Sequence, residues 1–389
     1  MALERVFRAK EDRRRLVSAG ESVDIPFLIT LLLVLAVGLT MLYSASCVQS
    51  LYDTGYVSST RYLEKQAVCA VIGLVAMVFV SRIPAEFWLK IAWPLYIASI
   101  VLLLLVLVFG QTVNGAKRWI SIAGVQFQPS EIAKFTMILL LAKLTRNFGS
   151  DAKTFRYGVL GFSGAMLGIL VPLALERHLS AIMLLGMVAV VMMFVAGTKA
   201  RWLLAGAGGA VVFMIVYVSL LGYAGDRITA WFHPEEDPGN TGYQILQSLY
   251  AIGSGGLFGL GLGKSRQKYM YLPFQYNDYI FAVICEELGL VGAILIIILF
   301  AVLIFRGYWI ALRARDRFST VLAAGLITQI AIQTIMNMGV VTNMLPSTGV
   351  ALPFFSYGGT ALAVNLAEMG IVLSISRYRN RAARQEERI

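Results

Sequence analysis

The sequence predicts an all-α integral membrane protein with about ten transmembrane helices, cytoplasmic termini and a large extracytoplasmic loop between the seventh and eighth spans. Three observations lead to this fold class. Of the 389 residues, 58% are hydrophobic and only 14% are charged, whereas a soluble globular chain carries roughly 25% charged residues. Apolar runs long enough to cross a hydrocarbon core of roughly 30 Å recur along the chain. Basic residues gather in alternate connecting segments, as the positive-inside rule requires.

The apolar runs define the expected spans one by one, and each is interpreted as a helix because backbone groups in lipid must be satisfied internally. The ten runs lie at about 25–46, 66–82, 90–110, 131–146, 157–175, 179–198, 202–222, 278–305, 319–342 and 360–376. The first run follows a basic tail and is too long for the apolar core of a signal peptide, so we expect it to be retained.

The distribution of charge sets the orientation. With the N-terminus inside, 23 of the 33 lysines and arginines fall on the cytoplasmic side. The net charge of +11 therefore reflects membrane topology rather than nucleic-acid binding. We expect a single polytopic domain over residues 1–389, with cytoplasmic tails at 1–24 and 377–389 and a long outer loop at 222–277. Long loops on one face predict that the protein acts at that face.

The first outer loop carries Lys117, Arg118 and Trp119, which place two cations beside an amphipathic ring. This suits a phosphate and a sugar face, although an interfacial anchor has the same composition.

The fourth span begins just after Gln128, with Pro and Ser as a helix start. Glu131 and Lys134 are spaced i,i+3 and can pair. An ionisable pair at membrane depth indicates function, and a helix-capping pair is the alternative.

The long outer loop contains Asp237 before a turn signal, then a short amphipathic helix expected at 243–252 and a glycine-rich stretch at 253–263. The glycines allow close backbone approach to a ligand, but the stretch lacks the ending of a Walker loop. Lys264, Arg266, Gln267 and Lys268 follow it. This cationic patch suits an anionic lipid headgroup such as a pyrophosphate, and a solvated loop is the alternative.

Asp278 stands where this loop becomes an apolar helix, as an N-cap or as a base kept at the water–lipid boundary. Glu286 and Glu287 follow about two turns later and need partners, which the basic outer loops can supply. The last outer segment, 343–359, has two prolines and three glycines among apolar residues, which predicts a re-entrant segment lining a cavity. Its candidate substrate contacts are Ser356, Tyr357 and Gly358.

Taken in order, these strings resemble the SEDS family, which includes RodA, FtsW and SpoVE. The matching strings are Asn114–Trp119, Gln128–Glu131, Asp237–Gln247, Gly253–Gly263, Asp278–Leu288 and Leu345–Gly359. The resemblance implies polymerisation of lipid II, a disaccharide-pentapeptide on undecaprenyl pyrophosphate, into β-1,4 glycan at the outer face of the bacterial cytoplasmic membrane. It implies a class B penicillin-binding protein, a transpeptidase, as partner. The catalytic aspartate of the family falls on Asp278, and a tryptophan important for its activity falls on Trp119.

Inverting glycosyl transfer needs one base on the acceptor hydroxyl and a device that stabilises the departing pyrophosphate, which leaves as an anion. We assign Asp278 as the base. The cations expected to bind pyrophosphate are Lys117, Arg118, Lys264 and Arg266. The other expected substrate-binding residues are Trp119, Gln128, Glu131, Lys134, Asp237, Gln267, Ser356, Tyr357 and Gly358. The sequence requires no cofactor, although Mg²⁺ or Mn²⁺ can share the pyrophosphate charge, with Asp237 or Glu131 as ligands.

The chain departs from the family pattern at two places. An outer Pro-Asp-Leu/Phe-Gly string is replaced by Glu176-Arg177-His178-Leu179-Ser180, and the residues before Asp278 lack the usual Pro-Glu-x-His-Thr pattern. Two other functions remain open: a flippase for the same lipid, and a non-catalytic scaffold for the transpeptidase. A role in elongation, division or sporulation is also left open.

Overall fold

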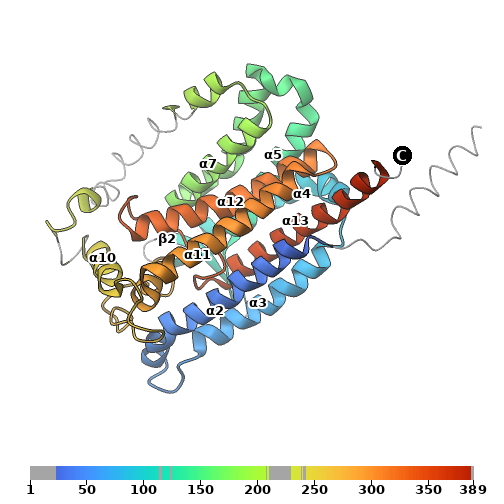
Figure 1. Ribbon diagram of the computed structural model, residues 1–389. Coiled ribbons are helices and arrows are strands. Elements are labelled where there is room, and N and C mark those ends of the chain that lie inside the picture. Colours follow the sequence, from blue (N-terminus) through green and yellow to red (C-terminus); the bar gives the residue numbers. More distant parts are fainter. Residues whose placement is uncertain are drawn as a thin grey trace, which may run out of the picture.

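The computed structural model describes residues 23–113, 116–122, 125–206, 208–209, 229–237, 239 and 242–386. In this part of the chain, long helices run roughly side by side in one bundle (Figure 1). The α-helices of ten or more described residues are α2 (Ile25–Asp53), α3 (Arg61–Val80), α4 (Ala85–Phe109), α5 (Pro129–Phe148), α6 (Phe162–Leu175), α7 (Leu179–Val195), α10 (Tyr243–Gly255), α11 (Ile280–Leu312), α12 (Arg317–Val341) and α13 (Gly359–Glu386).

The described helices agree with nine of the ten expected spans. Seven are long and apolar enough to cross a membrane: α2, α3, α4, the stretch 156–175 that ends in α6, α11, α12 and α13 as far as Arg377. The other two are α5, which carries buried charges, and α7, which has 17 residues. The seventh expected run, 202–222, lies mostly outside the described residues, as does most of the tail 1–24.

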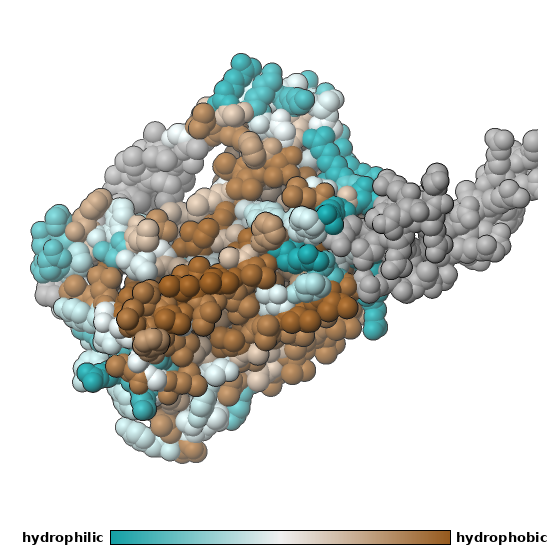
Figure 2. Space-filling model, in the orientation of Figure 1, coloured by the Kyte–Doolittle hydropathy of each residue, from teal (hydrophilic) through white to brown (hydrophobic). Residues whose placement is uncertain are grey.

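Burial separates the central helices from the peripheral ones. In α12 and α13, 78% and 67% of the span residues are buried, against 22% in α3 and 28% in α4. The centre of the bundle is therefore α12 and α13, with α5 packed on both. Large apolar side chains are exposed on α2, α3, α4 and α11, and Figure 2 shows a broad hydrophobic band with hydrophilic residues gathered toward the ends. This is the surface expected of a multi-pass membrane protein.

A small antiparallel sheet departs from the expected all-α fold. Its strands are β1 (Gln111–Val113), β2 (Ala116–Ile122) and β3 (Val125–Phe127), in the order β1-β2-β3. The sequence contains Asn114-Gly115 between the first two strands, a dipeptide typical of tight hairpins. The first outer loop is thus an ordered ribbon that presents Lys117, Arg118 and Trp119 from β2.

Helix α11 is interrupted at Gly289, where the backbone has φ 67° and ψ −169°. The glycine-rich loop enters this break. Leu260 N and Gly261 N donate to the carbonyls of Glu286 and Glu287, each at 3.0 Å. On the other side of the break, the N–H groups of the two residues after Gly289 donate to the carbonyls of residues 256 and 257, at 2.9 and 3.1 Å. The loop therefore satisfies the backbone groups that the broken turn leaves open.

Candidate active site

Asp278 lies directly before α11, at the end of the bundle where the outer loops gather. The helix begins at Ile280 with Tyr279 in the N-cap position and no side-chain cap, so Asp278 does not act as the N-cap. Its backbone carbonyl accepts a hydrogen bond of 2.7 Å from Asn337 Nδ2 on α12. The same nitrogen donates to Val350 O at 2.8 Å. One amide thus fixes both the predicted base and the segment 343–359.

The carboxylate of Asp278 faces the backbone of Gly349. A Cβ atom built on Gly349 would lie 3.2 Å from Asp278 Oδ2, and the residue has φ +68°, a conformation that favours glycine. The segment 343–359 therefore brings bare backbone against the carboxylate.

Segment 343–359 is non-helical up to the start of α13, and the apolar side chains Val350, Leu352, Phe354 and Phe355 are buried, so it is not a plain surface loop. Ser356 Oγ donates to Asn277 O at 2.6 Å and accepts from Leu352 N at 2.8 Å. Gln66 on α3 donates to Ser356 O at 3.1 Å and accepts from Gly358 N at 3.1 Å. The polar groups of two predicted substrate contacts, Ser356 and Gly358, are thus engaged in holding the segment itself.

Tyr357 belongs to an aromatic cluster at the same end of the bundle. Its ring lies 4.9 Å from that of Tyr62 and 6.0 Å from that of Tyr276, while the latter two rings are 4.6 Å apart. Tyr357 N also donates to Tyr276 O at 2.9 Å. The cluster fastens α3 to the residues that immediately precede Asp278.

Glu286 and Glu287 have partners in the loop that carries the cations. The backbone N–H groups of Arg266 and Gln267 donate to Glu286 at 3.0 and 3.3 Å. Lys268 Nζ lies 3.0 Å from Glu287 Oε1, and both side chains are almost fully buried. The basic partner that the sequence predicted for these carboxylates is therefore Lys268, whereas Arg266 contributes only its backbone.

The loop that these carboxylates hold leaves its other two cations accessible. Lys264 and Arg266 are exposed, and Gln267 is half-buried. Ser265 and Lys268 fix the main chain of this loop through their contacts with Glu287, while the side chains of Lys264 and Arg266 point outward. Such a loop can bind an anion without reorganising its backbone.

Arg118 of β2 contacts the corner between α6 and α7. Its Nη2 donates to Arg177 O. Burial raises the pKa of Glu176 to about 8, although Arg118 opposes the shift. Burial lowers the pKa of His178 to about 3, and the charges of Arg118 and Lys134 act in the same direction. The first of the two strings that depart from the family pattern thus forms a polar corner beside Arg118, with Glu176 buried in it.

This corner is connected to the predicted base. Ser180 Oγ donates to Thr348 O, next to the glycine that faces Asp278. The other two residues of the first outer loop stay at the surface: Lys117 is exposed, and Trp119 is half-buried. The structure therefore brings together β2, the α6–α7 corner, segment 343–359 and Asp278.

Glu131 and Lys134 pair as the sequence predicted, at 2.7 Å and with 9% and 5% of their side chains exposed. The pair lies in the first turns of α5, in the interior of the bundle. Its charges act on Glu368 of α13, which accepts a 2.9 Å hydrogen bond from Gln329 of α12. Glu131 is thus part of a buried polar cluster between three helices.

Gln128 and Asp237 stand apart from this cluster. Gln128 is half-buried at the N-cap of α5 and makes no side-chain cap. Asp237 lies in a turn, and its backbone carbonyl accepts a hydrogen bond of 3.0 Å from Gly242 N. The described residues contain no group of three or more His, Cys, Asp or Glu side chains that could hold a metal ion. The divalent cation shared by Asp237 or Glu131 stays a prediction.

Several residues that hold the site were missed by the sequence reasoning: Ser44, whose hydroxyl donates to Glu287, and Gln66, Ser180, Asn337 and Gly349. Gln66 and Asn337 carry a usable signal, because each is an amide in a largely apolar helix, and such residues are costly in lipid unless they serve the fold or the site. The sequence reasoning considered the outer loops and therefore overlooked them.

Comparison with known proteins gives the same result along the whole chain. Residues 25–381 match a family model for FtsW, RodA and SpoVE, described as a cell cycle protein. Stage V sporulation protein E of Bacillus subtilis is 40% identical over 362 residues, covering 92% of this chain and 98% of that protein. A probable peptidoglycan glycosyltransferase FtsW of Geobacter metallireducens is 39% identical, covering 92% and 95%.

Solved structures show the same fold. A chain from a peptidoglycan synthase complex, in which polymerization and crosslinking are coordinated, superposes with a TM-score of 0.77 at 28% identity and covers 92% of this chain and 98% of that chain. The rod shape determining protein RodA of Thermus thermophilus superposes with a TM-score of 0.68 at 28% identity, covering 92% and 98%.

Proposed function

The chain belongs to the FtsW/RodA/SpoVE family, and from this membership we propose that it polymerises lipid II into β-1,4 glycan strands at the outer face of the bacterial cytoplasmic membrane. It is a peptidoglycan glycosyltransferase and a multi-pass membrane protein. We propose its substrate, the membrane in which it lies and the roles of its individual residues.

The contact between Asp278 and Gly349 carries the assignment of the base. A general base must lie within hydrogen-bond reach of the proton that it takes, and Gly349 places no side chain beside the Asp278 carboxylate to obstruct the acceptor. Asp278 Oδ2 takes the proton of the acceptor 4-hydroxyl, and the oxygen of that hydroxyl forms a bond to the anomeric carbon of the donor. The bond from that carbon to the pyrophosphate breaks, and its electron pair leaves with the pyrophosphate, so the anomeric configuration inverts.

The leaving group is stabilised by cations on two sides of the site. Lys264 and Arg266 extend from the loop fixed by Glu286 and Glu287, and Lys117 extends from β2. Fixed cations aimed at developing negative charge lower the barrier without reorganisation. Arg118 donates to Arg177 O, which supports a second role for it in orienting β2.

A class B penicillin-binding protein is the proposed partner. The solved complex with the same fold coordinates polymerization with crosslinking, which supports a crosslinking enzyme beside this chain as well. The two reactions act successively on one glycan strand, so a complex would deliver the new strand directly to the transpeptidase.

The test is lipid II polymerisation by the purified full chain, with and without a class B penicillin-binding protein. We expect glycan from wild type and none from Asp278→Asn at equal folding and equal lipid II binding. Glu236→Gln, which removes an exposed carboxylate in another outer loop, is the matched control and should keep polymerising. Polymer from Asp278→Asn would remove Asp278 as the base. No polymer from wild type, even with a bound transpeptidase, would contradict the function, and lipid II translocation would then separate a flippase from a scaffold.

A further inference from the structure

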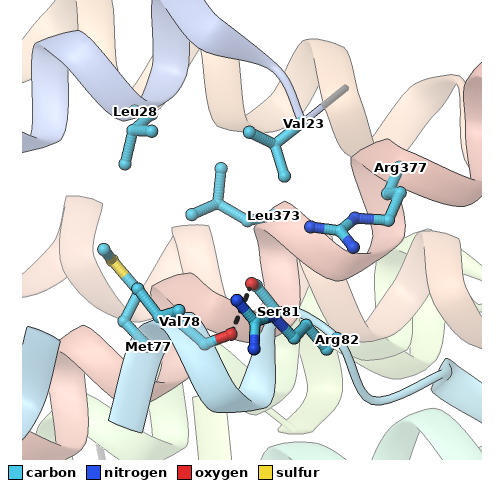
Figure 3. A pocket seen from close by; sticks show the side chains of 8 residues that line it. All are labelled: Val23, Leu28, Met77, Val78, Ser81, Arg82, Leu373 and Arg377. Carbon is cyan, nitrogen blue, oxygen red and sulfur yellow. Dashed lines mark hydrogen bonds between the residues drawn. The ribbon is translucent and has the colours of Figure 1, made fainter. Parts of the chain in front are cut away.

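A cavity of about 180 Å³ lies at the end of the bundle opposite Asp278, between α2, α3 and α13 (Figure 3). Its lining residues are Val23, Leu28, Met77, Val78, Ser81, Arg82, Leu373 and Arg377. The outer end of α3 is marked by Tyr62, which contacts Tyr276 near the base. The cavity begins at the other end of that 20-residue helix, roughly 30 Å away at 1.5 Å per residue.

Both charged residues of the lining are arginines. Figure 3 shows Arg82 and Arg377 on one side of the cavity and Leu28 and Met77 on the other. In the part of the chain that the structure describes, neither guanidinium has a hydrogen-bond or ion-pair partner, and the buried Nε of Arg377 is unsatisfied. Two guanidiniums together, one with a buried unsatisfied donor, favour an anionic ligand.

The chain itself does not supply that anion from the neighbouring acid. Asp24 follows Val23, but Arg306 binds its carboxylate through two hydrogen bonds of 2.9 and 3.0 Å, and the carboxylate also caps α2 at Phe27 N. Among the described residues, the positive charge of the cavity is therefore left for a ligand.

The remaining lining indicates what kind of anion fits. Five of the eight lining residues are apolar, and Val78 is also 47% exposed on the lipid-facing side of α3, next to Val75 at 65%. The cavity thus continues into the hydrophobic surface of the bundle. It is smaller than a whole phospholipid, so it accommodates a headgroup while the acyl chains follow the exposed valines.

We propose that this cavity binds the phosphate headgroup of an anionic phospholipid from the cytoplasmic leaflet. Basic pockets between helices at the cytoplasmic boundary bind such headgroups, and each cation near the membrane surface strengthens binding by about 1 kcal/mol, or roughly fivefold. The lipid would join α2, α3 and α13 at their inner ends, far from the chemistry. This inference does not depend on the proposed function.

The test uses the full chain in mixed micelles, with phosphatidylglycerol as the probe and phosphatidylcholine as the comparison lipid. Native mass spectrometry counts retained lipids, and titration gives relative affinities. Wild type should prefer phosphatidylglycerol, and the double variant Arg82→Gln/Arg377→Gln should bind it about 10- to 30-fold more weakly. Arg146→Gln, an exposed arginine at the inner end of α5 that does not line the cavity, is the matched control and should bind as wild type does.

Three results would overturn the proposal. Equal binding by the double variant and wild type would show that the two guanidiniums do not hold the lipid. An equal loss in Arg146→Gln would reduce the effect to general surface charge. Inorganic phosphate that displaces phosphatidylglycerol at similar concentration would identify a soluble anion site. A folding defect is detected separately, because the double variant must keep its circular dichroism and its monodisperse elution.

Discussion

Replacing Lys268 by Met should destabilise the protein more than any other single change in the outer loops. Its Nζ lies 3.0 Å from Glu287 Oε1, donates to Gly263 O at 2.6 Å, and the side chains of Lys268 and Glu287 are 2% and 0% exposed. Methionine fills a similar volume but has no charge. The variant therefore keeps the packing and leaves Glu287 without its cation.

The magnitude follows from what Glu287 retains. Removing one partner of a buried ion pair costs about 3–5 kcal/mol. Glu287 keeps hydrogen bonds from Ser44 Oγ and from Ser265 N, so we expect the lower end of the range, about 3 kcal/mol. That is a change of roughly 150-fold in the folding equilibrium. The double variant Lys268→Met/Glu287→Gln removes both charges and should recover at least half of the loss.

The assay is unfolding by SDS in mixed micelles, followed by helical circular dichroism. Lys264→Met is the matched control, because this lysine lies in the same loop but is exposed, and its change should stay within about 0.5 kcal/mol of wild type. The reasoning would be refuted if Lys268→Met unfolded like wild type. It would equally fail if the double variant were no more stable than the single one, since the loss would then not come from an unpaired charge.

Three further predictions concern the site. Gly349→Ala should lower the rate of polymerisation about tenfold, because the new Cβ would lie 3.2 Å from Asp278 Oδ2 and the backbone there is left-handed. The control Gly253→Ala places its Cβ in open space and should stay active. Equal rates for the two variants would contradict the contact. Asn337→Leu should lower the rate of polymerisation and also the stability, because the carbonyls of Asp278 and Val350 lose their donor. The expected loss of stability is about 1–3 kcal/mol, measured by SDS unfolding. An unchanged rate of polymerisation would exclude a positioning role for Asn337. Burial raises the pKa of Glu176 from 4.5 to about 8, so the wild type should lose stability as the pH rises from about 4.5 through 8. Unfolding curves of Glu176→Gln should show a smaller dependence of stability on pH. An identical dependence in wild type and variant would contradict the raised pKa.

The spans were predictable because membrane helices need long apolar runs, and hydropathy reports such runs directly. The run at 319–342, for example, corresponds to α12 within the usual uncertainty of helix ends, and the run at 25–46 begins where α2 begins, although α2 continues to Asp53. The small sheet was not predicted, although Asn114-Gly115 signals a hairpin, because the first outer loop was interpreted only through its charged and aromatic residues. The break at Gly289 was not predictable, since hydropathy continues unchanged across it.

The site was predictable in kind but not in its pairings. That Glu286 and Glu287 need basic partners follows from the cost of buried charge, yet the choice of Lys268 over Lys264 depends on how the loop folds back. In the same way, the position of Asp278 before a helix left an N-cap and a base as alternatives, and the family resemblance favoured the base. Its contact with Gly349, 71 residues later, depends on the course of a non-helical segment that no local pattern specifies.

The interruption of α11 at Gly289 has a consequence for how the protein is made. The chain is synthesised from its N-terminus, so the glycine-rich loop 253–263 is made before α11. The loop supplies partners for the carbonyls of Glu286 and Glu287, which the break leaves open. The outer turns of α11 therefore complete their backbone hydrogen bonds on a segment that was synthesised earlier.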